Sequence, residues 1–176
     1  MDKLTLPNLL SASRLALAIP SFLLIRSEAW LFSAIVILLA VTADMADGYL
    51  ARRRRQVSTF GGLLDHGSDA IFVTATLAAL ALSGMVPWIL PPLVGVAFIQ
   101  YTLDSRALSG QPLRASRVGR YNGIAYFVLA GFPSMQHALG FYPVAEDYFM
   151  WAGWILVIST IISMSDRGIA VIRKLW

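Results

Sequence analysis

The chain contains no cysteine and few charged residues. Among its 176 residues, Asp, Glu, Lys and Arg make up 14%, whereas a typical soluble domain has about 25%. Without cysteine, the chain forms neither a disulfide framework nor a cysteine-based metal or redox site. Because 57% of the residues are hydrophobic and so few are charged, the composition excludes an ordinary soluble domain.

The formal net charge of +4 would also fit a nucleic-acid-binding protein. A basic soluble surface, however, does not come with repeated runs of about 20 apolar residues, which are the length of a membrane-spanning helix. We therefore expect membrane lipid, and no nucleic acid, as the partner of this surface.

Six segments are long and apolar enough to cross a membrane as helices. They cover residues 9–25, 30–50, 60–82, 88–103, 118–136 and 148–172. The connections are short, and Pro87, Pro91 and Pro92 make the start of the fourth segment irregular. The sequence therefore predicts an all-α integral membrane protein, with six transmembrane helices in one bundle and a single domain over residues 1–176.

Lys and Arg are distributed unevenly between the two sides of this predicted bundle. If the N-terminus is cytoplasmic, Arg26 lies on the outer side and the other thirteen of the fourteen basic residues lie on the inner side. This is the asymmetry described by the positive-inside rule. We therefore expect cytoplasmic N- and C-termini, in a bacterial or archaeal cell membrane.

Four aspartates lie inside or at the edge of the second and third predicted helices. An Asp at the centre of a membrane helix costs about 2.5–3.5 kcal/mol, so four of them need an explanation. Asp44 and Asp47 are three residues apart, and Asp65 and Asp69 are four apart. Each pair therefore shares one helix face. Because a short arginine-rich turn joins the two helices, we expect the pairs to meet near the cytoplasmic boundary.

Converging carboxylates repel one another unless a cation neutralises them. With no Cys and no suitably spaced His, the ligands would all be oxygen atoms, which favours Mg²⁺ or Mn²⁺, with Ca²⁺ as an alternative, over zinc. Two such ions are a common device in phosphoryl chemistry. The alternative is a structural ion-pair network, which we do not expect because no basic residue shares these faces in the pattern.

Small residues accompany the aspartates. Gly48 is four residues after Asp44, and Gly61 is four residues before Asp65, so both glycines lie on the carboxylate faces. They leave room for a ligand to approach the backbone, although close helix packing would also favour small residues. Arg52 follows Gly48 by one turn and is placed to contact a phosphate or a base.

These residues form one continuous pattern, D-x-x-D-G-x-x-A-R-x8-G-x3-D-x3-D. Its fixed positions are Asp44, Asp47, Gly48, Ala51, Arg52, Gly61, Asp65 and Asp69. The pattern resembles the signature of the CDP-alcohol phosphotransferase family at every fixed position and spacing. That family is also built on six membrane helices, so the resemblance extends over most of the chain. A weaker resemblance, to the segment before the first helix of many members, covers residues 7–14.

The resemblance implies a reaction in phospholipid biosynthesis. Members move a phosphatidyl or similar group from a CDP-linked donor, here CDP-diacylglycerol, to an alcohol acceptor and release CMP. It implies two Mg²⁺ or Mn²⁺ ions and a homodimer, with the active site at the cytoplasmic side. Metal ligands would be Asp44, Asp47, Asp65 and Asp69, with Asp69 also the catalytic general base. The CDP-binding residues would be Asn8, Gly48, Ala51, Arg52 and Gly61.

Arg106, Arg114, Arg117 and Arg120 crowd the turn between the fourth and fifth predicted helices. Topology alone could explain them, yet Arg120 begins a helix, where an unpaired charge is costly, and the cluster suits a phosphate on the acceptor. We expect Arg106, Arg117 and Arg120 to bind such an acceptor, for example glycerol 3-phosphate or an inositol phosphate. Many glycerol-phosphate members show Gly-Lys-x-Lys-Thr where residues 119–123 read GRYNG, which leaves the acceptor open.

Asn8, Ser11 and Arg14 recur every three residues and form one polar stripe. They fit either polar contacts between helices or a role near the CDP site. His66 follows Asp65 directly and points about 100° away from it on a helix, so we do not expect it to be a metal ligand.

Two other functions remain as alternatives. In a divalent-cation transporter the aspartates would form a transit site, but the helices become almost entirely apolar beyond Asp44 and Asp69. A membrane prenyltransferase also holds Mg²⁺-pyrophosphate with paired aspartates, but the Asp-Gly-x-x-Ala-Arg element is not its pattern.

Overall fold

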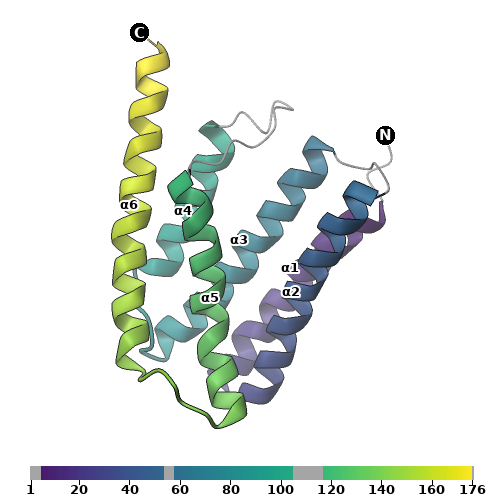
Figure 1. Cartoon of the computed structure of the whole chain (residues 1–176), viewed down its shortest axis with the longest axis vertical. Coiled ribbons are helices and arrows are strands. Elements are labelled where there is room, and N and C mark those ends of the chain that lie inside the picture. The colour runs from purple at the N-terminus through teal and green to yellow at the C-terminus, as the bar shows by residue number, and fades with distance from the viewer. Residues whose placement is uncertain (1–4, 54–57, 105–116, 176) are drawn as a thin grey trace.

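Six helices build the computed structural model, which describes residues 5–53, 58–104 and 117–175 (Figure 1). These helices are α1 (Leu6–Arg26), α2 (Trp30–Arg53), α3 (Thr59–Leu82), α4 (Leu90–Asp104), α5 (Arg117–Leu139) and α6 (Asp147–Leu175). The described residues contain no strand. The prediction of an all-α chain with six helices is confirmed, and the predicted bounds agree to within a few residues.

Local signals explain where the helices begin. The Thr5 hydroxyl accepts a hydrogen bond from the backbone N–H of Asn8 at 3.4 Å and caps α1. Ser58 caps α3 in the same way, through the N–H of Gly61 at 3.0 Å. Helix α4 begins at Leu90, two residues later than predicted, and carries two prolines in its first turn, where their missing N–H groups cost nothing.

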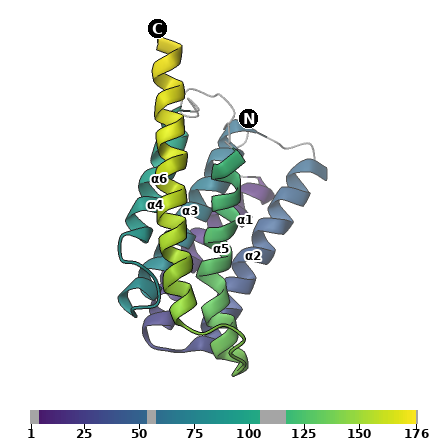
Figure 2. The ribbon, with the colours of Figure 1, turned by 60° about the vertical axis from the view of Figure 1, so that its left-hand side comes forward.

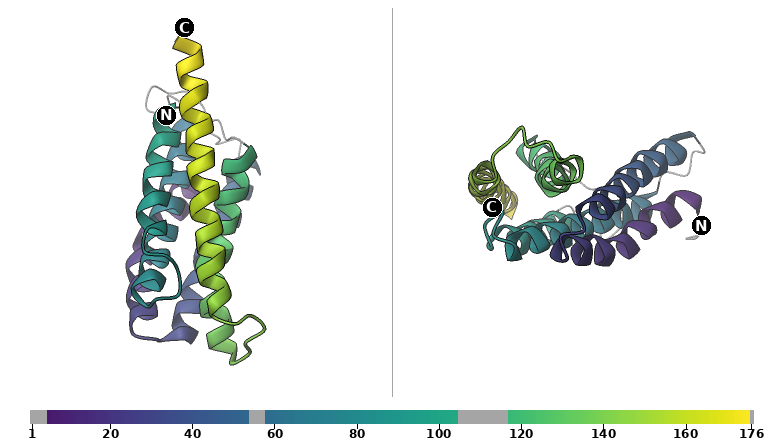
Figure 3. Two further views of the ribbon diagram at one scale, coloured as in Figure 1. Left: turned by 90° about the vertical axis from the view of Figure 1, so that its left-hand side faces the viewer. Right: turned by 90° about the horizontal axis from the view of Figure 1, so that it is seen from below.

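Successive helices run in opposite directions, as Figures 1 and 2 show. Seen along the bundle, they are arranged in a ring in the order α1, α2, α5, α6, α4, α3, and α3 returns to α1 (Figure 3). A further contact between α3 and α5 crosses this ring. The ends of α2, α4 and α6 and the starts of α1, α3 and α5 therefore lie at one end of the bundle, the upper end in Figure 1.

Within the described residues, three stretches are long and apolar enough, by length and composition, to cross a membrane: Leu6–Arg26, Trp30–Ala51 and Asp147–Ile169. Helix α4 is shorter, with 15 residues. Helix α3 carries Asp65, His66 and Asp69 in its first half, and α5 has Arg117 and Arg120 in its first turn. Large apolar side chains such as Ile19, Leu31 and Ile155 are exposed on the outside, as expected for a surface that faces lipid.

Buried polar side chains join neighbouring helices across the bundle. Ser21 of α1 and Thr76 of α3 are hydrogen-bonded at 2.9 Å. Ser33 of α2 and Ser134 of α5 are hydrogen-bonded at 3.0 Å. In a membrane, where the hydrophobic effect contributes little to helix association, such hydrogen-bonded pairs hold helices together. They therefore help to fix the positions of the helices that carry the site.

Candidate metal and substrate site

The two aspartate pairs meet at the end of the bundle where α2 ends and α3 begins. Asp44, Asp47 and Asp65 each offer one carboxylate oxygen, and these oxygens lie within 4.8 Å of one another. Asp69 lies one turn beyond Asp65 on α3 and shares with the other three aspartates a contact to one side chain of α1.

That side chain is Arg14, which is fully buried. Its Nη1 donates to Asp44 at 2.8 Å and also to Asp69. Its Nη2 donates to Asp47 at 2.7 Å and also to Asp65. The expectation that no basic residue shares the aspartate faces is therefore wrong. Spacing along α2 and α3 does not reveal a residue that a third helix brings to the same place.

The four carboxylates differ in their access to solvent. Asp47 is 2% exposed, and it also accepts a hydrogen bond from Ser11 Oγ of α1 at 2.7 Å. The side chains of Asp44, Asp65 and Asp69 are 41%, 31% and 23% exposed. A ligand can therefore reach the cluster from the side of these three, while Asp47 forms its floor.

The residue types fit a hard divalent cation. The convergent atoms are all carboxylate oxygens, and four carboxylates with one guanidinium leave an excess of negative charge. The Nε of Arg14 is buried and has no hydrogen-bond partner among the described residues, so the guanidinium does not complete the site by itself.

Two of the residues implied in CDP binding lie in contact across α1 and α3. A Cβ at Gly61 would be 3.0 Å from Asn8 Oδ1, a tight contact from which the Asn8 side chain would have to move, so the glycine favours the close approach of these helices. Gly48 and Ala51 are half-buried in the last turns of α2. Arg52 belongs to α2, but its side chain is outside the described residues.

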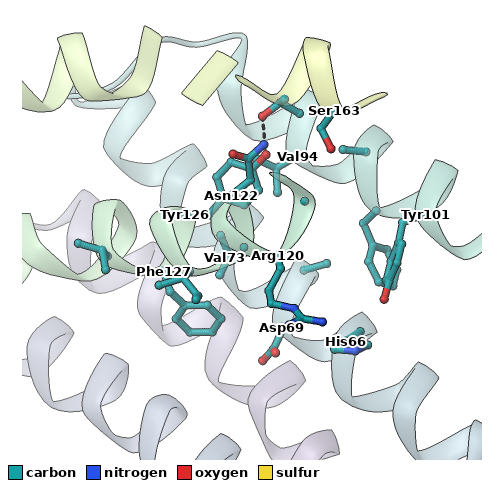
Figure 4. A pocket seen from close by; sticks show the side chains of 18 of the residues that line it. His66, Asp69, Val73, Val94, Tyr101, Arg120, Asn122, Tyr126, Phe127 and Ser163 are labelled. Carbon is teal, nitrogen blue, oxygen red and sulfur yellow. Dashed lines mark hydrogen bonds between the residues drawn. The ribbon is translucent and has the colours of Figure 1, made fainter. Parts of the chain in front are cut away.

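A cavity of about 840 Å³ adjoins the aspartates and is lined by α2 to α6. Asp44 and Asp69 line it, whereas Asp47 and Asp65 do not. Figure 4 shows the Arg120 side chain of α5 pointing toward Asp69, with His66 beside them. The carboxylate of Asp69 thus lies between the aspartate cluster and the cavity.

Tyr101 of α4 and Arg167 of α6 form a further polar part of the cavity wall. The guanidinium of Arg167 lies over the Tyr101 ring, 4.5 Å from its centroid, and His66 contacts the edge of the same ring. The sequence did not predict Arg167 as a site residue, because only the packing of α6 on α4 brings it close. Of the predicted acceptor residues, Arg120 lines the cavity; Arg106 and the side chain of Arg117 are outside the described residues.

Most of the remaining cavity wall is apolar. Val73 of α3, Val94 of α4 and Phe127 of α5 line it, as Figure 4 shows. Asn122 of α5 also lines it and accepts a hydrogen bond from Ser159 of α6 at 2.7 Å. The cavity wall is therefore charged beside Asp69 and mostly apolar elsewhere.

Fold and site together define a helical membrane protein with a four-carboxylate centre beside a partly apolar cavity. Residues 4–161 match the CDP-alcohol phosphatidyltransferases. The chain belongs to this family, which confirms the resemblance found in the sequence. Members of the family generally use divalent metals, in agreement with the carboxylate cluster.

Curated relatives fall into two groups by name. The chain is 35% identical over 141 residues to a "Putative cardiolipin synthase" of Mycobacterium tuberculosis, covering 75% of this chain and 64% of that protein. It is 37% identical over 93 residues to a cardiolipin synthase (CMP-forming) of Streptomyces coelicolor, covering 48% and 42%. It is 30% identical over 176 residues to the CDP-diacylglycerol–glycerol-3-phosphate 3-phosphatidyltransferase of Bacillus subtilis, covering 90% of each. The chain thus spans less than two thirds of the length of the cardiolipin synthase relatives.

Proposed function

We propose that the chain is an enzyme that transfers a phosphatidyl group from CDP-diacylglycerol to the hydroxyl of a phosphorylated alcohol and releases CMP, in phospholipid biosynthesis. The observation that carries this proposal is the convergence of four aspartates beside a cavity that is lined by two arginines. The family and the names of the relatives support the same reaction.

Asp44, Asp47 and Asp65 would hold Mg²⁺ or Mn²⁺, with Asp69 as a further ligand and two ions in all. The metal, when bound, would offset the negative charge of the pyrophosphate and of the departing CMP. Support comes from the all-oxygen donor set and from the short separation of the three carboxylate oxygens.

Asp69 would act as the general base. It touches the carboxylate cluster through Arg14 and also lines the cavity, so it is the carboxylate best placed between donor and acceptor. Its carboxylate would accept the proton of the acceptor hydroxyl as that oxygen bonds to the phosphatidyl phosphorus, while the bond from phosphorus to the CMP oxygen breaks.

The CDP group would lie against the first turns of α1 and α3 and the last turns of α2. Asn8, Gly48, Ala51, Arg52 and Gly61 would bind it. The close approach of Asn8 and Gly61 supports a shared surface for these residues next to the aspartates.

The acceptor would enter the cavity, with its phosphate at Arg120 and Arg167. Both side chains line the cavity, and Figure 4 shows Arg120 pointing toward Asp69. Glycerol 3-phosphate fits this charged part of the wall. A second candidate is a phospholipid with a glycerol headgroup, favoured by the apolar part of the cavity wall, which a small polar acceptor leaves unused. The cardiolipin synthase names agree with this second candidate.

All six helices would cross the membrane, with both termini and the site on the cytoplasmic side of a bacterial or archaeal cell membrane. The charge asymmetry of the sequence and the grouping of the aspartates, Arg120 and Arg167 at one end of the bundle support this orientation. A homodimer stays a prediction of the family resemblance.

A divalent-cation transporter is less consistent with the helices. Apart from the four site aspartates, α1, α2 and α3 contain no acidic residue. The polar groups deeper in the bundle, such as Ser21 and Thr76, are hydrogen-bonded to each other. A cation would therefore find no second carboxylate site along these helices.

The test is an assay of the purified full chain in mixed micelles with CDP-diacylglycerol and Mg²⁺. Glycerol 3-phosphate and phosphatidylglycerol are offered separately, and CMP and the lipid product are quantified. We expect metal-dependent CMP release with one acceptor and a product of matching mass. Metal uptake into liposomes, with no CMP formed from any acceptor, would instead favour the transporter.

A further inference from the structure

Arg14 is the largest fully buried side chain of the described protein, and it occupies the centre of the aspartate cluster. Each of its two terminal nitrogens donates to one aspartate of α2 and one of α3. One guanidinium therefore bridges both pairs and ties α1 to α2 and α3 at this point.

The oxygens that bind Arg14 come from the same carboxylates that would bind metal. A divalent ion needs oxygen ligands at about 2.0–2.6 Å, inside the group formed by Asp44, Asp47 and Asp65. The guanidinium nitrogens lie 2.7 and 2.8 Å from oxygens of Asp47 and Asp44. A dication at the centre of this group would be in direct contact with the positive guanidinium, so the two cations repel each other and compete for one space.

The contacts of Arg14 are also incomplete. Its Nε is buried and has no hydrogen-bond partner among the described residues. A buried donor without a partner destabilises this arrangement, because its lost contact with water is not replaced. One positive charge leaves four carboxylates mostly uncompensated, whereas two divalent ions would balance their charge. Arg14 can hold the cluster together, but the remaining negative charge and the unpaired Nε favour its replacement by metal.

We propose that Arg14 is an internal counter-cation that holds the four carboxylates together and that a divalent metal displaces as it binds. Arg14 is therefore a positioning residue that sets the metal affinity of the site. This inference rests on the metal site of the proposed function. It explains how four acidic side chains stay together within a membrane bundle each time the metal leaves.

The test compares Arg14→Gln with Arg26→Gln, the same change at an exposed arginine near the other end of α1. Mn²⁺ binding to the purified proteins is measured by electron paramagnetic resonance of free Mn²⁺, without substrate. Because metal no longer displaces a charged hydrogen-bonded group, Arg14→Gln should bind Mn²⁺ at least about tenfold more tightly than wild type. Arg26→Gln should match wild type.

Thermal unfolding supplies the second readout. In EDTA, Arg14→Gln should unfold at a lower temperature than wild type, and saturating Mn²⁺ should raise its unfolding temperature more than that of wild type. Arg14→Lys, which keeps one charge but cannot span four carboxylates, should fall between the two. Unchanged or weaker Mn²⁺ binding in the Arg14 variants overturns the proposal.

A measurement on wild type covers the case in which the variants do not fold. In protein labelled with ¹⁵N-arginine, Mg²⁺ should shift the Nη signals of Arg14 and leave those of Arg26 in place. Unshifted Arg14 signals at saturating Mg²⁺ overturn displacement. If wild type binds metal and only this shift is missing, the proposed function stands; if wild type binds no metal at all, the metal site of the proposed function fails as well.

Discussion

Replacing Asp69 by Asn removes the proposed general base while keeping the size of the side chain. A positioned base contributes about 10²–10⁴-fold to a reaction rate. That range corresponds to about 3–5 kcal/mol of activation free energy. The side chain of Asp69 is 23% exposed, and Arg14 keeps its contacts to the three other aspartates. We therefore expect kcat to fall strongly while the unfolding temperature changes little.

The assay measures CMP release from CDP-diacylglycerol at saturating acceptor and metal, with thermal unfolding in parallel. Asp166→Asn is the control, since Asp166 is exposed on α6 and does not line the cavity. Asp69→Asn should lose about two to four orders of magnitude in kcat, and Asp166→Asn should stay near wild type. Full turnover by a folded Asp69→Asn protein would refute the assignment of the base.

Three further substitutions test the packing and the cavity. Gly61→Ala places a Cβ 3.0 Å from Asn8 Oδ1, whereas the Cβ of Gly62→Ala meets nothing within 4 Å. Because overpacking costs about 1–3 kcal/mol, only Gly61→Ala should lower the unfolding temperature. Arg120→Ala should raise the KM for the acceptor about tenfold or more, because a charged hydrogen bond is lost, and leave the KM for the donor unchanged in steady-state kinetics. Ser21→Ala breaks the 2.9 Å hydrogen bond to Thr76 and should cost about 0.6–1.7 kcal/mol in reversible unfolding in detergent. Equal unfolding temperatures for the two glycine variants would contradict the close contact of Gly61 with Asn8. An unchanged acceptor KM would contradict the role of Arg120, and unchanged stability of Ser21→Ala would contradict a stabilising bond to Thr76.

Much of the fold could be predicted because apolar length is a direct property of the sequence. The second helix begins at Trp30 as predicted, and the third ends at Leu82 as predicted. The start of the fourth helix was less predictable, because three prolines lie in or next to its first turn. That all six helices span the membrane stays a prediction, since three stretches of the described residues meet the criterion of length and composition.

The site was predictable only where its residues share a helix. The three- and four-residue spacings already indicated that Asp44 pairs with Asp47 and Asp65 with Asp69. The sequence also revealed the polar stripe that contains Arg14, but periodicity does not tell which neighbouring helix a stripe faces. The bridge from Arg14 to all four aspartates depends on the packing of α1 on α2 and α3.

The cavity was not predictable for the same reason. Arg120 lies in the first turn of α5 and Arg167 near the end of α6, and no local pattern links two residues so far apart in the chain. Their common cavity results from the order of helices in the ring, in which α6 packs between α4 and α5. Packing also places Tyr101 under the Arg167 guanidinium.

Anomalous diffraction would show directly whether the four aspartates bind divalent metal. Crystals of the full chain would be grown with Mn²⁺ and a CDP-linked lipid, and data would be collected at the manganese absorption edge. We expect an anomalous peak among the carboxylates of Asp44, Asp47 and Asp65, with the Arg14 guanidinium moved from its present position. A map with Arg14 still bridging the four aspartates, and no manganese peak beside them, would contradict this expectation.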